Sequence, residues 1–218
     1  MKAGVPRVRS IDGPGHLVLR ETGDLVELVV RNVVLLSSAA LATERSFGAL
    51  AATLPSAAPR RVVVGGLGFG ATLRGVLDAT PAATRVTVVE KVAEIPPLVR
   101  GSLAHIAGDP LADPRVELVV GDVGAVIERE KGSTDVILMD VDNGPHWASF
   151  RTNARFYSKA GLAPFRRALA PGGALAVWSG YRADAFVQRL REAGFGASVV
   201  PLHERGRVRA RAYVGRLG

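Results

Sequence analysis

The stretch Val62–Arg74, VVVGGLGFGATLR, constrains the fold most, because three valines lead into a glycine-rich turn and then into a helical segment. Gly66, Gly68 and Gly70 occupy alternate positions of that turn. Glycine lets the backbone approach a ligand closely, and the start of a helix offers free amide groups. The same spacing also occurs in tight turns without a ligand, so a nucleotide-binding role needs support elsewhere in the chain.

From residue 61 onward, short β-branched runs alternate with helical stretches, a pattern typical of a parallel sheet covered by helices. The predicted strands are Arg61–Gly66, Arg85–Glu90, Val116–Val120, Asp135–Asp140 and Ala174–Trp178. The predicted helices are Ala71–Ala79, Ala93–Ile106, Val123–Arg129, Ala154–Ala170 and Ala183–Ala193. Pro171–Gly173 is predicted to end the fourth helix before the fifth strand begins.

Two further runs, at 195–202 and 208–216 and joined by a loop at His203–Arg207, predict an antiparallel hairpin at the edge of the sheet. We therefore predict an α/β fold with a doubly wound, mostly parallel seven-stranded sheet of the class I methyltransferase type. A generic doubly wound fold without the hairpin is the alternative.

The N-terminal part has a different pattern. HLVLRE, LVELVV and VVLLSS indicate three short strands, TGD at 22–24 marks a hairpin turn, and a helix over about 39–54 follows. A three-stranded sheet is poorly stable alone, so we expect it to pack on the main domain or to pair with a second subunit of a homodimer. The expected division is a β region at 1–38 and a Rossmann-like domain at 39–218.

The net charge of +8 is concentrated at the two ends of the chain, with +3 in residues 1–20 and +4 in residues 203–218. Such a distribution argues against a nucleic-acid-binding face. The chain has no cysteine and no visible cluster of metal ligands. It also has no apolar run of the roughly 20 residues that a membrane span needs, and no signal peptide. We expect a cytoplasmic protein with no metal and no membrane or nucleic-acid partner.

Three acidic residues follow predicted strands and support the glycine turn as a ligand site. Glu90 ends the second strand, 20 residues beyond Gly70, where a carboxylate can accept hydrogen bonds from both hydroxyls of a ribose. Asp122 follows the third strand, and its carboxylate or the neighbouring amide of Val123 can address an adenine; it can also cap the next helix. Asp140 closes the fourth strand, at the topological switch point where α/β ligands bind.

In this order the motifs resemble the spermidine synthase (polyamine aminopropyltransferase) family, within the class I S-adenosylmethionine-dependent methyltransferase superfamily. The resemblance runs from about residue 17 to 179 and covers GGLGFGATLR, VTVVE, DPRVELVVGD, DVILMDVDNGP and FYSKAGLAPFRRALAPGGALAVWS. It implies S-adenosylmethionine or its decarboxylated form as the donor. Gly66–Gly70 would hold the methionine-like portion, Glu90 the ribose and Asp122–Val123 the adenine. Lys91 and Asp140 are also expected among the cofactor-binding residues. The rival, a dinucleotide dehydrogenase, fits less well because the spacing is not GxGxxG.

The family pattern is changed at the positions that would hold an amine. The Asp of its glycine loop, which binds the aminopropyl ammonium, corresponds to Phe69, and loss of this carboxylate also removes repulsion against the carboxylate of intact S-adenosylmethionine. Its Tyr-Gln pair before the first core strand corresponds to Phe47 and Gly48. Both polar side chains are therefore missing.

The family's D-S-S/T-D-P segment becomes DVDN, at 140–143. Asp140 keeps the place of the candidate catalytic base, Asn143 replaces the carboxylate that binds the amine, and Asp142 lies one residue earlier. His146 can act as a general base because the pKa of histidine lies near neutrality, although a loop histidine is often only solvated. An aromatic substrate wall is expected at Phe47, Phe69, His146, Trp147, Phe150 and Phe156.

We therefore expect a spermidine-synthase-like transferase with a diverged small-molecule acceptor. Methyl transfer to a fairly apolar acceptor is the leading hypothesis, with Asp140, Asp142 or His146 handling the proton. The alternatives are aminopropyl transfer from the decarboxylated donor to an amine, cyclisation of the donor's own side chain, and a non-catalytic nucleoside-binding protein.

Overall fold

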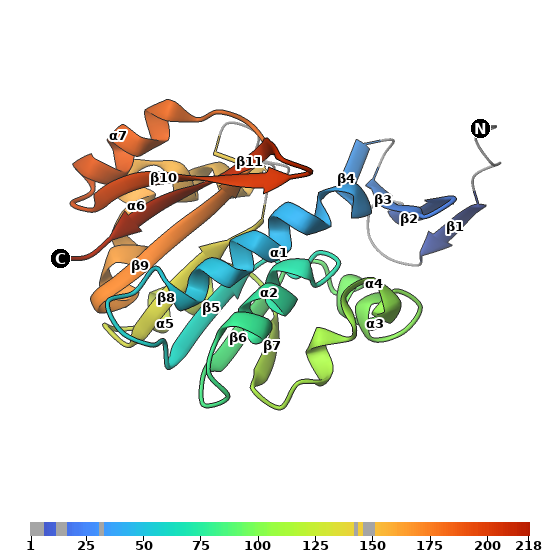
Figure 1. The fold of residues 1–218 in the computed structure, drawn as a ribbon, viewed down its shortest axis with the longest axis horizontal. Coiled ribbons are helices and arrows are strands. Elements are labelled where there is room, and N and C mark those ends of the chain that lie inside the picture. The colour runs from blue at the N-terminus through green and yellow to red at the C-terminus, as the bar shows by residue number, and fades with distance from the viewer. Residues whose placement is uncertain (1–6, 12–16, 31–32, 142–143, 146–150) are drawn as a thin grey trace.

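The structure, a computed structural model, describes residues 7–11, 17–30, 33–141, 144–145 and 151–218. They form a large sheet with helices on both faces and a smaller sheet at the N-terminal end of the chain (Figure 1). The small sheet lies at one end of the molecule and continues through β4 into α1, which runs across the large sheet.

The large sheet has seven strands in the order β10-β11-β9-β8-β5-β6-β7. Its strands are β5 (Arg61–Gly65), β6 (Arg85–Glu90), β7 (Val116–Val120), β8 (Thr134–Met139), β9 (Leu169–Ser179), β10 (Gly196–Glu204) and β11 (Arg207–Arg216). The pairs among β5, β6, β7, β8 and β9 are parallel, whereas β11 is antiparallel to both β9 and β10. The predicted fold class, including the edge hairpin, is confirmed.

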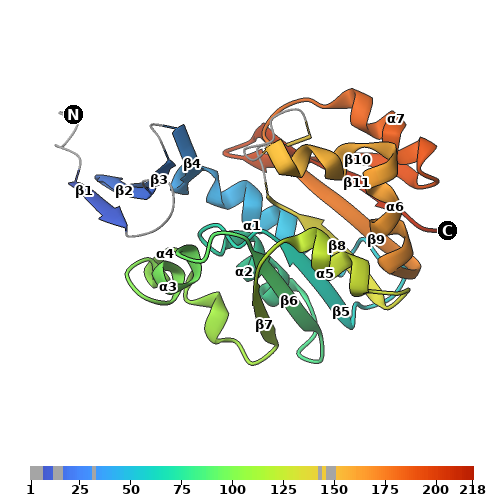
Figure 2. The ribbon, with the colours of Figure 1, turned by 180° about the vertical axis from the view of Figure 1, so that it is seen from behind.

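The helices cover the two faces of this sheet. They are α1 (Leu41–Ala49), α2 (Ala71–Ala79), α3 (Ile95–Arg100), α4 (Ala104–Ala107), α5 (Val123–Arg129), α6 (Lys159–Ala168) and α7 (Asp184–Glu192). Short 3₁₀ turns are η1 (Ser38–Ala40), η2 (Leu50–Ala52), η3 (Pro110–Ala112) and η4 (Arg151–Tyr157). Helices α1 and α2 cover the face toward the viewer in Figure 1, and α5 and α6 cover the opposite face, seen in Figure 2.

Alternate residues of each strand enter two separate hydrophobic cores. Val62 and Val64 pack with residues of α1 and α2, while Val63 packs with residues of α5, α6 and α7. Successive side chains of a strand point to opposite faces, so a sheet covered on both sides needs apolar residues at every position. This requirement explains why the central strands are continuous valine, isoleucine and leucine runs.

Three predicted boundaries were wrong. Pro171–Gly173 does not separate helix from strand, because β9 already begins at Leu169; the register with β8 shifts between Thr134 and Val136 and accommodates the extra residues. The helix predicted at Ala93–Ile106 is split into α3 and α4, since Gly101 ends the first of them. The helix predicted from Ala154 begins only at Lys159, where Ser158 accepts a hydrogen bond from the Gly161 amide.

The N-terminal sheet has the strand order β1-β2-β3-β4. Its strands are β1 (Arg7–Ile11), β2 (Leu17–Thr22), β3 (Leu25–Val30) and β4 (Val33–Ser37). β1 is not among the predicted strands; it has no buried face, and Val8 is 63% exposed. Leu17, Leu19 and Leu28 belong to the same core as residues of α1 and α2, so the small sheet packs on the main domain.

Helices α1 and α2 cross at two glycines. A Cβ added to Gly48 would lie 2.0 Å from the carbonyl oxygen of Thr72, and one added to Gly75 would lie 2.1 Å from that of Arg45. The two backbones therefore touch where a side chain of any size would hold them apart. This contact sets the height of α1 above the start of α2.

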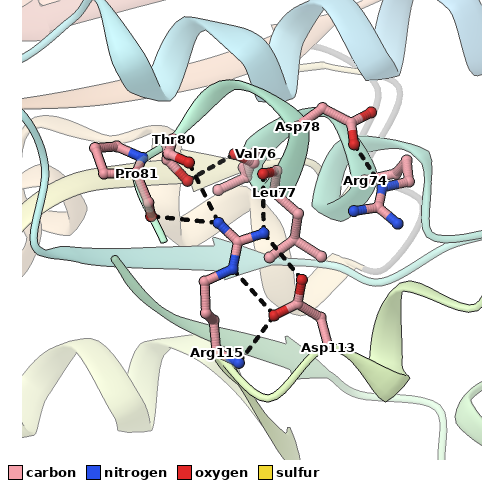
Figure 3. A network of polar contacts seen from close by, with 8 residues as sticks. All are labelled: Arg74, Val76, Leu77, Asp78, Thr80, Pro81, Asp113 and Arg115. Carbon is pink, nitrogen blue, oxygen red and sulfur yellow. Dashed lines mark hydrogen bonds and ion pairs between the residues drawn. The ribbon is translucent and has the colours of Figure 1, made fainter. Parts of the chain in front are cut away.

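The other end of α2 is fixed by Arg115 (Figure 3). Its guanidinium group forms a two-point ion pair with Asp113 and donates hydrogen bonds to the carbonyl oxygens of Leu77, Thr80 and Pro81 at 2.9–3.3 Å. The hydrogen bond from Arg115 lowers the pKa of Asp113. A cation at the carbonyl end of a helix satisfies acceptors that have no partner within the helix, so α2 is held firmly at its C-terminal end.

Candidate active site at the carboxyl edge of the sheet

The glycine turn joins β5 to α2, and all three of its alternate glycines have positive φ angles. A Cβ on Gly66 would lie 2.1 Å from the carbonyl oxygen of Asp140, and one on Gly70 would lie 2.7 Å from Pro110 Cγ. The Cβ direction of Gly68 is open apart from Leu36, at 3.6 Å. Gly66 and Gly70 therefore fix the turn against its neighbours, while Gly68 leaves backbone accessible to a ligand.

Glu90 lies at the end of β6, directly beside this turn, and is 6% exposed. Its Oε2 accepts a hydrogen bond from the Leu67 amide at 2.9 Å, and its Oε1 accepts one from the Val92 amide at 2.8 Å. Burial raises the pKa of Glu90, and the amide hydrogen bonds only partly oppose this. Each carboxylate oxygen can accept more than one hydrogen bond, so the group holds the loop and keeps capacity for two ribose hydroxyls.

Asp122 lies at the end of β7 and caps α5, as one of its two predicted roles required. Its Oδ1 accepts hydrogen bonds from the Gly124 amide at 2.8 Å and from Arg155 at 2.6 Å, and Lys91 Nζ lies 3.6 Å from Oδ2. Partial burial raises the pKa of Asp122, but the hydrogen bonds and charges of Arg155, Gly124 and Lys91 outweigh this and lower it. The adenine contact of Asp122 and of its buried neighbour Val123 stays a prediction.

Arg155 was not predicted for the site. Its guanidinium carbon lies 4.5 Å from the centre of the Phe156 ring, within the range of a cation–π contact. Arg155, Phe156 and Gly124 line a cavity of about 260 Å³ beside α5 and α6. Phe156 is 5% exposed and belongs to the core on the α5–α7 face, so its place in an open substrate wall is not supported.

The aromatic positions near the glycine turn need correction. Phe69 is 3% exposed and Phe47 is fully buried, and both belong to the core between the sheet, α1 and α2. Neither ring lines an open surface, and a contact of Phe69 with a donor stays a prediction. Gly48 lies in the contact between α1 and α2, where no longer side chain fits, so its identity reflects helix packing.

Asp140 follows β8 at the switch point, next to β5. Its amide donates to the Gly65 carbonyl oxygen at 2.8 Å, and its Oδ2 accepts a hydrogen bond from Thr72 Oγ1 at 2.5 Å. Thr72 Oγ1 also lies 3.3 Å from the carbonyl oxygen of Glu44. Thr72 is 1% exposed, so this hydroxyl is a buried connection between the end of β8 and α1.

Glu44 is the functional candidate that the sequence analysis missed. Burial raises the pKa of Glu44 well above its ordinary range, and the charge of Asp140 raises it further. Within the described residues, the contact of Glu44 with this cluster is made by its main-chain carbonyl oxygen, through Thr72. A signal existed in the sequence, because Glu44 is the lone acidic residue in the helix predicted over 39–54.

Trp178 adds an unused donor at the same edge. Met139 and Val177 are paired in the parallel ladder of β8 and β9, so the next residues, Asp140 and Trp178, lie side by side at the carboxyl edge. Trp178 is 7% exposed, and no residue in the described part of the chain accepts a hydrogen bond from its indole nitrogen. A buried donor without a partner costs free energy, so this N–H is a candidate contact for a ligand.

Several predicted residues lie outside the described ranges, namely Asp142, Asn143, His146, Trp147 and Phe150. Their roles stay predictions. Among the described residues, no group of three or more potential ligands could hold a metal ion. Within the same residues, no helix has the length and hydropathy needed to cross a membrane.

Comparison with known proteins points to one kind of enzyme, although no family model matches the chain. Polyamine aminopropyltransferase 2 of Pseudomonas aeruginosa is 36% identical over 123 residues, which are 55% of this chain and 33% of the relative. Polyamine aminopropyltransferase of a Synechococcus species is 31% identical over 126 residues, 56% of this chain and 38% of the relative. The match thus spans little more than a third of these relatives' own length.

The fold neighbours agree with these relatives. Spermidine synthase from Thermotoga maritima superposes with a TM-score of 0.77 at 18% identity, covering 97% of this chain and 73% of the other. A spermidine synthase in complex with the transition-state analogue AdoDATO gives a TM-score of 0.73 at 17% identity, covering 97% and 72%. At such identities the likeness shows the fold alone. Together with the curated relatives, it makes this chain spermidine synthase-like, in fold throughout and in sequence over about half of its length.

Proposed function

We propose that the chain is a transferase that moves the aminopropyl group of decarboxylated S-adenosylmethionine to a small amine acceptor. The observation that carries this proposal is Asp140, whose carboxylate is held beside the glycine turn by the Thr72 hydroxyl, in a chain whose curated relatives are named polyamine aminopropyltransferases. The sequence suggested that the acceptor side had lost much of its countercharge, but this carboxylate remains. An amine is cationic at neutral pH, and a site with a carboxylate suits it.

Methyl transfer, the leading expectation from sequence, is not supported. It rested on the loss of the family's carboxylate at Phe69 and on the loss of polar groups that would hold an amine, and Phe69 and Phe47 are buried in the core. The curated relatives are named as aminopropyltransferases. We therefore prefer the alternative that the sequence analysis ranked second.

The proposed reaction is a displacement at the carbon next to the donor's sulfonium. The amine nitrogen forms the new C–N bond, the C–S bond breaks with its electron pair going to sulfur, and methylthioadenosine leaves. Asp140 is the candidate for accepting the proton that the amine gives up, and the Thr72 hydroxyl orients its carboxylate. Glu90 and the amides of the glycine turn would align the donor, and alignment supplies much of the rate in such a reaction.

The direct test incubates the protein with 1,4-diaminobutane and either donor, followed by mass spectrometry. We expect aminopropylated diamine and methylthioadenosine from the decarboxylated donor, and loss of both with Asp140→Asn. Methylated diamine and S-adenosylhomocysteine from intact S-adenosylmethionine would overturn the proposal. Binding of methylthioadenosine without any turnover would favour the non-catalytic alternative.

We also propose that the protein acts as a cytoplasmic homodimer. The small sheet ends in the edge strands β1 and β4, which can pair with a second chain. Light scattering of the purified protein measures the assembly, and cell fractionation measures the location. A monomer at micromolar concentration would contradict the first part.

A further inference from the structure

The edge hairpin of the large sheet carries a group of arginines at its turn. β9 ends at Ser179, which pairs with Arg211 of β11. The part of the hairpin formed by residues 202–210 therefore extends past the end of β9 as a two-stranded ribbon (Figure 1). We call this part the projecting ribbon. Three arginines in it are exposed to solvent, namely Arg205, Arg207 and Arg209.

The positive charge of the projecting ribbon is not balanced by its surroundings. None of these three arginines, nor Arg211, forms an ion pair or a side-chain hydrogen bond with a residue in the described part of the chain. Glu204 is the only acidic residue in the sequence from 195 to 218. Beyond the end of β9, Asp184 is already paired with Arg182. The ribbon thus presents a net positive charge that a polyanion can neutralise.

A β-bulge distributes the arginines over both faces of the hairpin. The register of β10 and β11 shifts within the ribbon and leaves Arg209 as an extra residue on β11. Arg211 lies opposite Pro201 of β10. Arg207 lies opposite Glu204, three residues farther along β10, and successive residues of a strand alternate between faces. Arg207 and Arg211 therefore lie on opposite faces. A planar lipid surface would meet only one of these faces, whereas a flexible polymer can follow both.

An exposed aromatic ring lies close in the chain to the base of the ribbon. Tyr181 follows Ser179, the β9 partner of Arg211, by two residues and is 58% exposed. Guanidinium groups bind phosphates through paired hydrogen bonds, and the bases of a single nucleic-acid strand stack on aromatic rings. An acidic peptide has no base to stack, and the bases of a duplex are already stacked on one another. The combination favours a single strand.

We propose that the projecting ribbon and Tyr181 bind a single-stranded nucleic acid, with the arginines on its phosphates and the tyrosine ring on a base. In the sequence, the position of the basic residues at the two ends of the chain argued against a nucleic-acid-binding face. The fold instead collects the C-terminal group on one ribbon. This binding is separate from the proposed transfer reaction, because it uses neither the glycine turn nor Asp140.

The first test measures the affinity for a fluorescently labelled oligothymidylate of roughly 20 nucleotides by anisotropy, over a range of salt concentrations. The variant combines Arg205→Gln, Arg207→Gln and Arg209→Gln. Each phosphate contact with a single strand contributes about −0.7 to the slope of log affinity against log salt concentration. The slope should therefore become shallower by about 2, and the affinity at low salt should fall at least about tenfold.

A matched control separates the ribbon from the net charge of the protein. It combines Arg85→Gln, Arg100→Gln and Arg129→Gln, which are exposed positions on β6, α3 and α5 and change the net charge by the same amount. This control should bind the oligonucleotide as tightly as the unchanged protein. Equal losses in the two triple variants would overturn the proposal, as would a lack of binding by the unchanged protein at low salt.

The second test concerns the kind of polyanion. Tyr181→Leu should lower the affinity for the oligothymidylate about fivefold and leave the salt slope unchanged, because stacking carries no charge. An unaltered affinity would overturn the assignment to a nucleic-acid strand. Tighter binding of a duplex of the same length, of polyglutamate or of phosphatidylserine vesicles would overturn it as well.

Discussion

The two halves of the candidate site differ in how their polar groups are satisfied. On the donor side, Glu90 accepts hydrogen bonds from the amides of Leu67 and Val92, and Asp122 is held by one amide and two cations. On the acceptor side, the negative charge of Asp140 raises the pKa of Glu44, and the indole N–H of Trp178 has no acceptor within the described residues.

This difference indicates which half is built in advance. Glu90 and Asp122 are held in one orientation by hydrogen bonds before a ligand binds. Such groups need little rearrangement on binding, so the proposed donor half is preorganised. In the acceptor half, the negative charge of Asp140 raises the pKa of Glu44, and a bound cation would lower it again. The first two predictions test the packing of Gly66 against Asp140 and the donor half, the third tests whether the halves respond separately, and the fourth tests the exposed ion pair of Asp122.

The largest effect is expected where Gly66 of the glycine turn packs against Asp140. Gly66→Ala places a Cβ against the carbonyl oxygen of Asp140 at a φ of +92°, so the unfolding free energy should fall by roughly 3 kcal/mol. Gly132→Ala is the matched control, because its φ is +63° but no atom lies within 4 Å of its Cβ. That variant should lose only about 1 kcal/mol. Urea unfolding measures both variants, and equal losses of unfolding free energy would contradict close packing of Gly66 against Asp140.

The next largest effect concerns the donor side. Glu90→Ala leaves the buried amides of Leu67 and Val92 without acceptors, and the affinity for methylthioadenosine should fall by at least about 30-fold. Glu94→Ala is the control, since this glutamate forms no capping hydrogen bond with α3. Calorimetry measures both affinities. A loss below about threefold for Glu90→Ala would show that the donor half does not depend on this carboxylate.

A smaller effect should separate acceptor from donor. Thr72→Val removes the hydroxyl that donates to Asp140 but keeps the shape of the side chain, so KM for the amine should rise about tenfold while donor affinity stays unchanged. Thr80→Val, at the other end of α2, loses a hydrogen bond to the Val76 carbonyl oxygen and should change stability only. If Thr72→Val weakens both substrates equally, the two halves are not independent.

The smallest effect is expected from Arg155→Ala. Its side chain is 51% exposed, so the loss of the ion pair with Asp122 should cost less than about 1 kcal/mol of unfolding free energy at neutral pH. Because the pKa of Asp122 is lowered in the folded protein, this contribution is present above the ordinary carboxyl range and disappears as the pH falls through the folded pKa. Urea unfolding at neutral and at strongly acidic pH checks the sign; a difference that grows toward acid would contradict it.

The sequence was sufficient for the large sheet and for the positions of three acidic residues at its edge. Valine-rich runs ending in glycine or in an acidic residue marked the strand ends, and parallel strands bring such ends together, so Glu90, Asp122 and Asp140 were placed correctly at one edge. The boundaries of α2, β6, β7 and α5 were predicted to the residue. Errors arose where tertiary contacts decide, as in β9, where a register shift accommodates Pro171–Gly173.

The acceptor side could not be predicted in the same way. Whether Phe47 and Phe69 face a ligand or the core depends on how closely α1 approaches the sheet, and that distance is set by glycines on two different helices. The contact of the Glu44 main-chain carbonyl with Thr72 depends on the same approach. A periodic pattern predicts the apolar face of a helix but not how closely that helix packs on its neighbour. The surroundings of these residues could therefore be determined only from the three-dimensional structure.

The crossing of α1 and α2 also limits how this protein can change over evolutionary time. The resemblance aligns Gly48 with a glutamine of the spermidine synthase family, yet a side chain there would strike the backbone at Thr72. A single mutation therefore cannot place a glutamine at this position without separating the helices and disturbing the hydrogen bond between Thr72 and Asp140. A lineage that has adopted the close helix contact cannot reach the glutamine through small, individually tolerated steps.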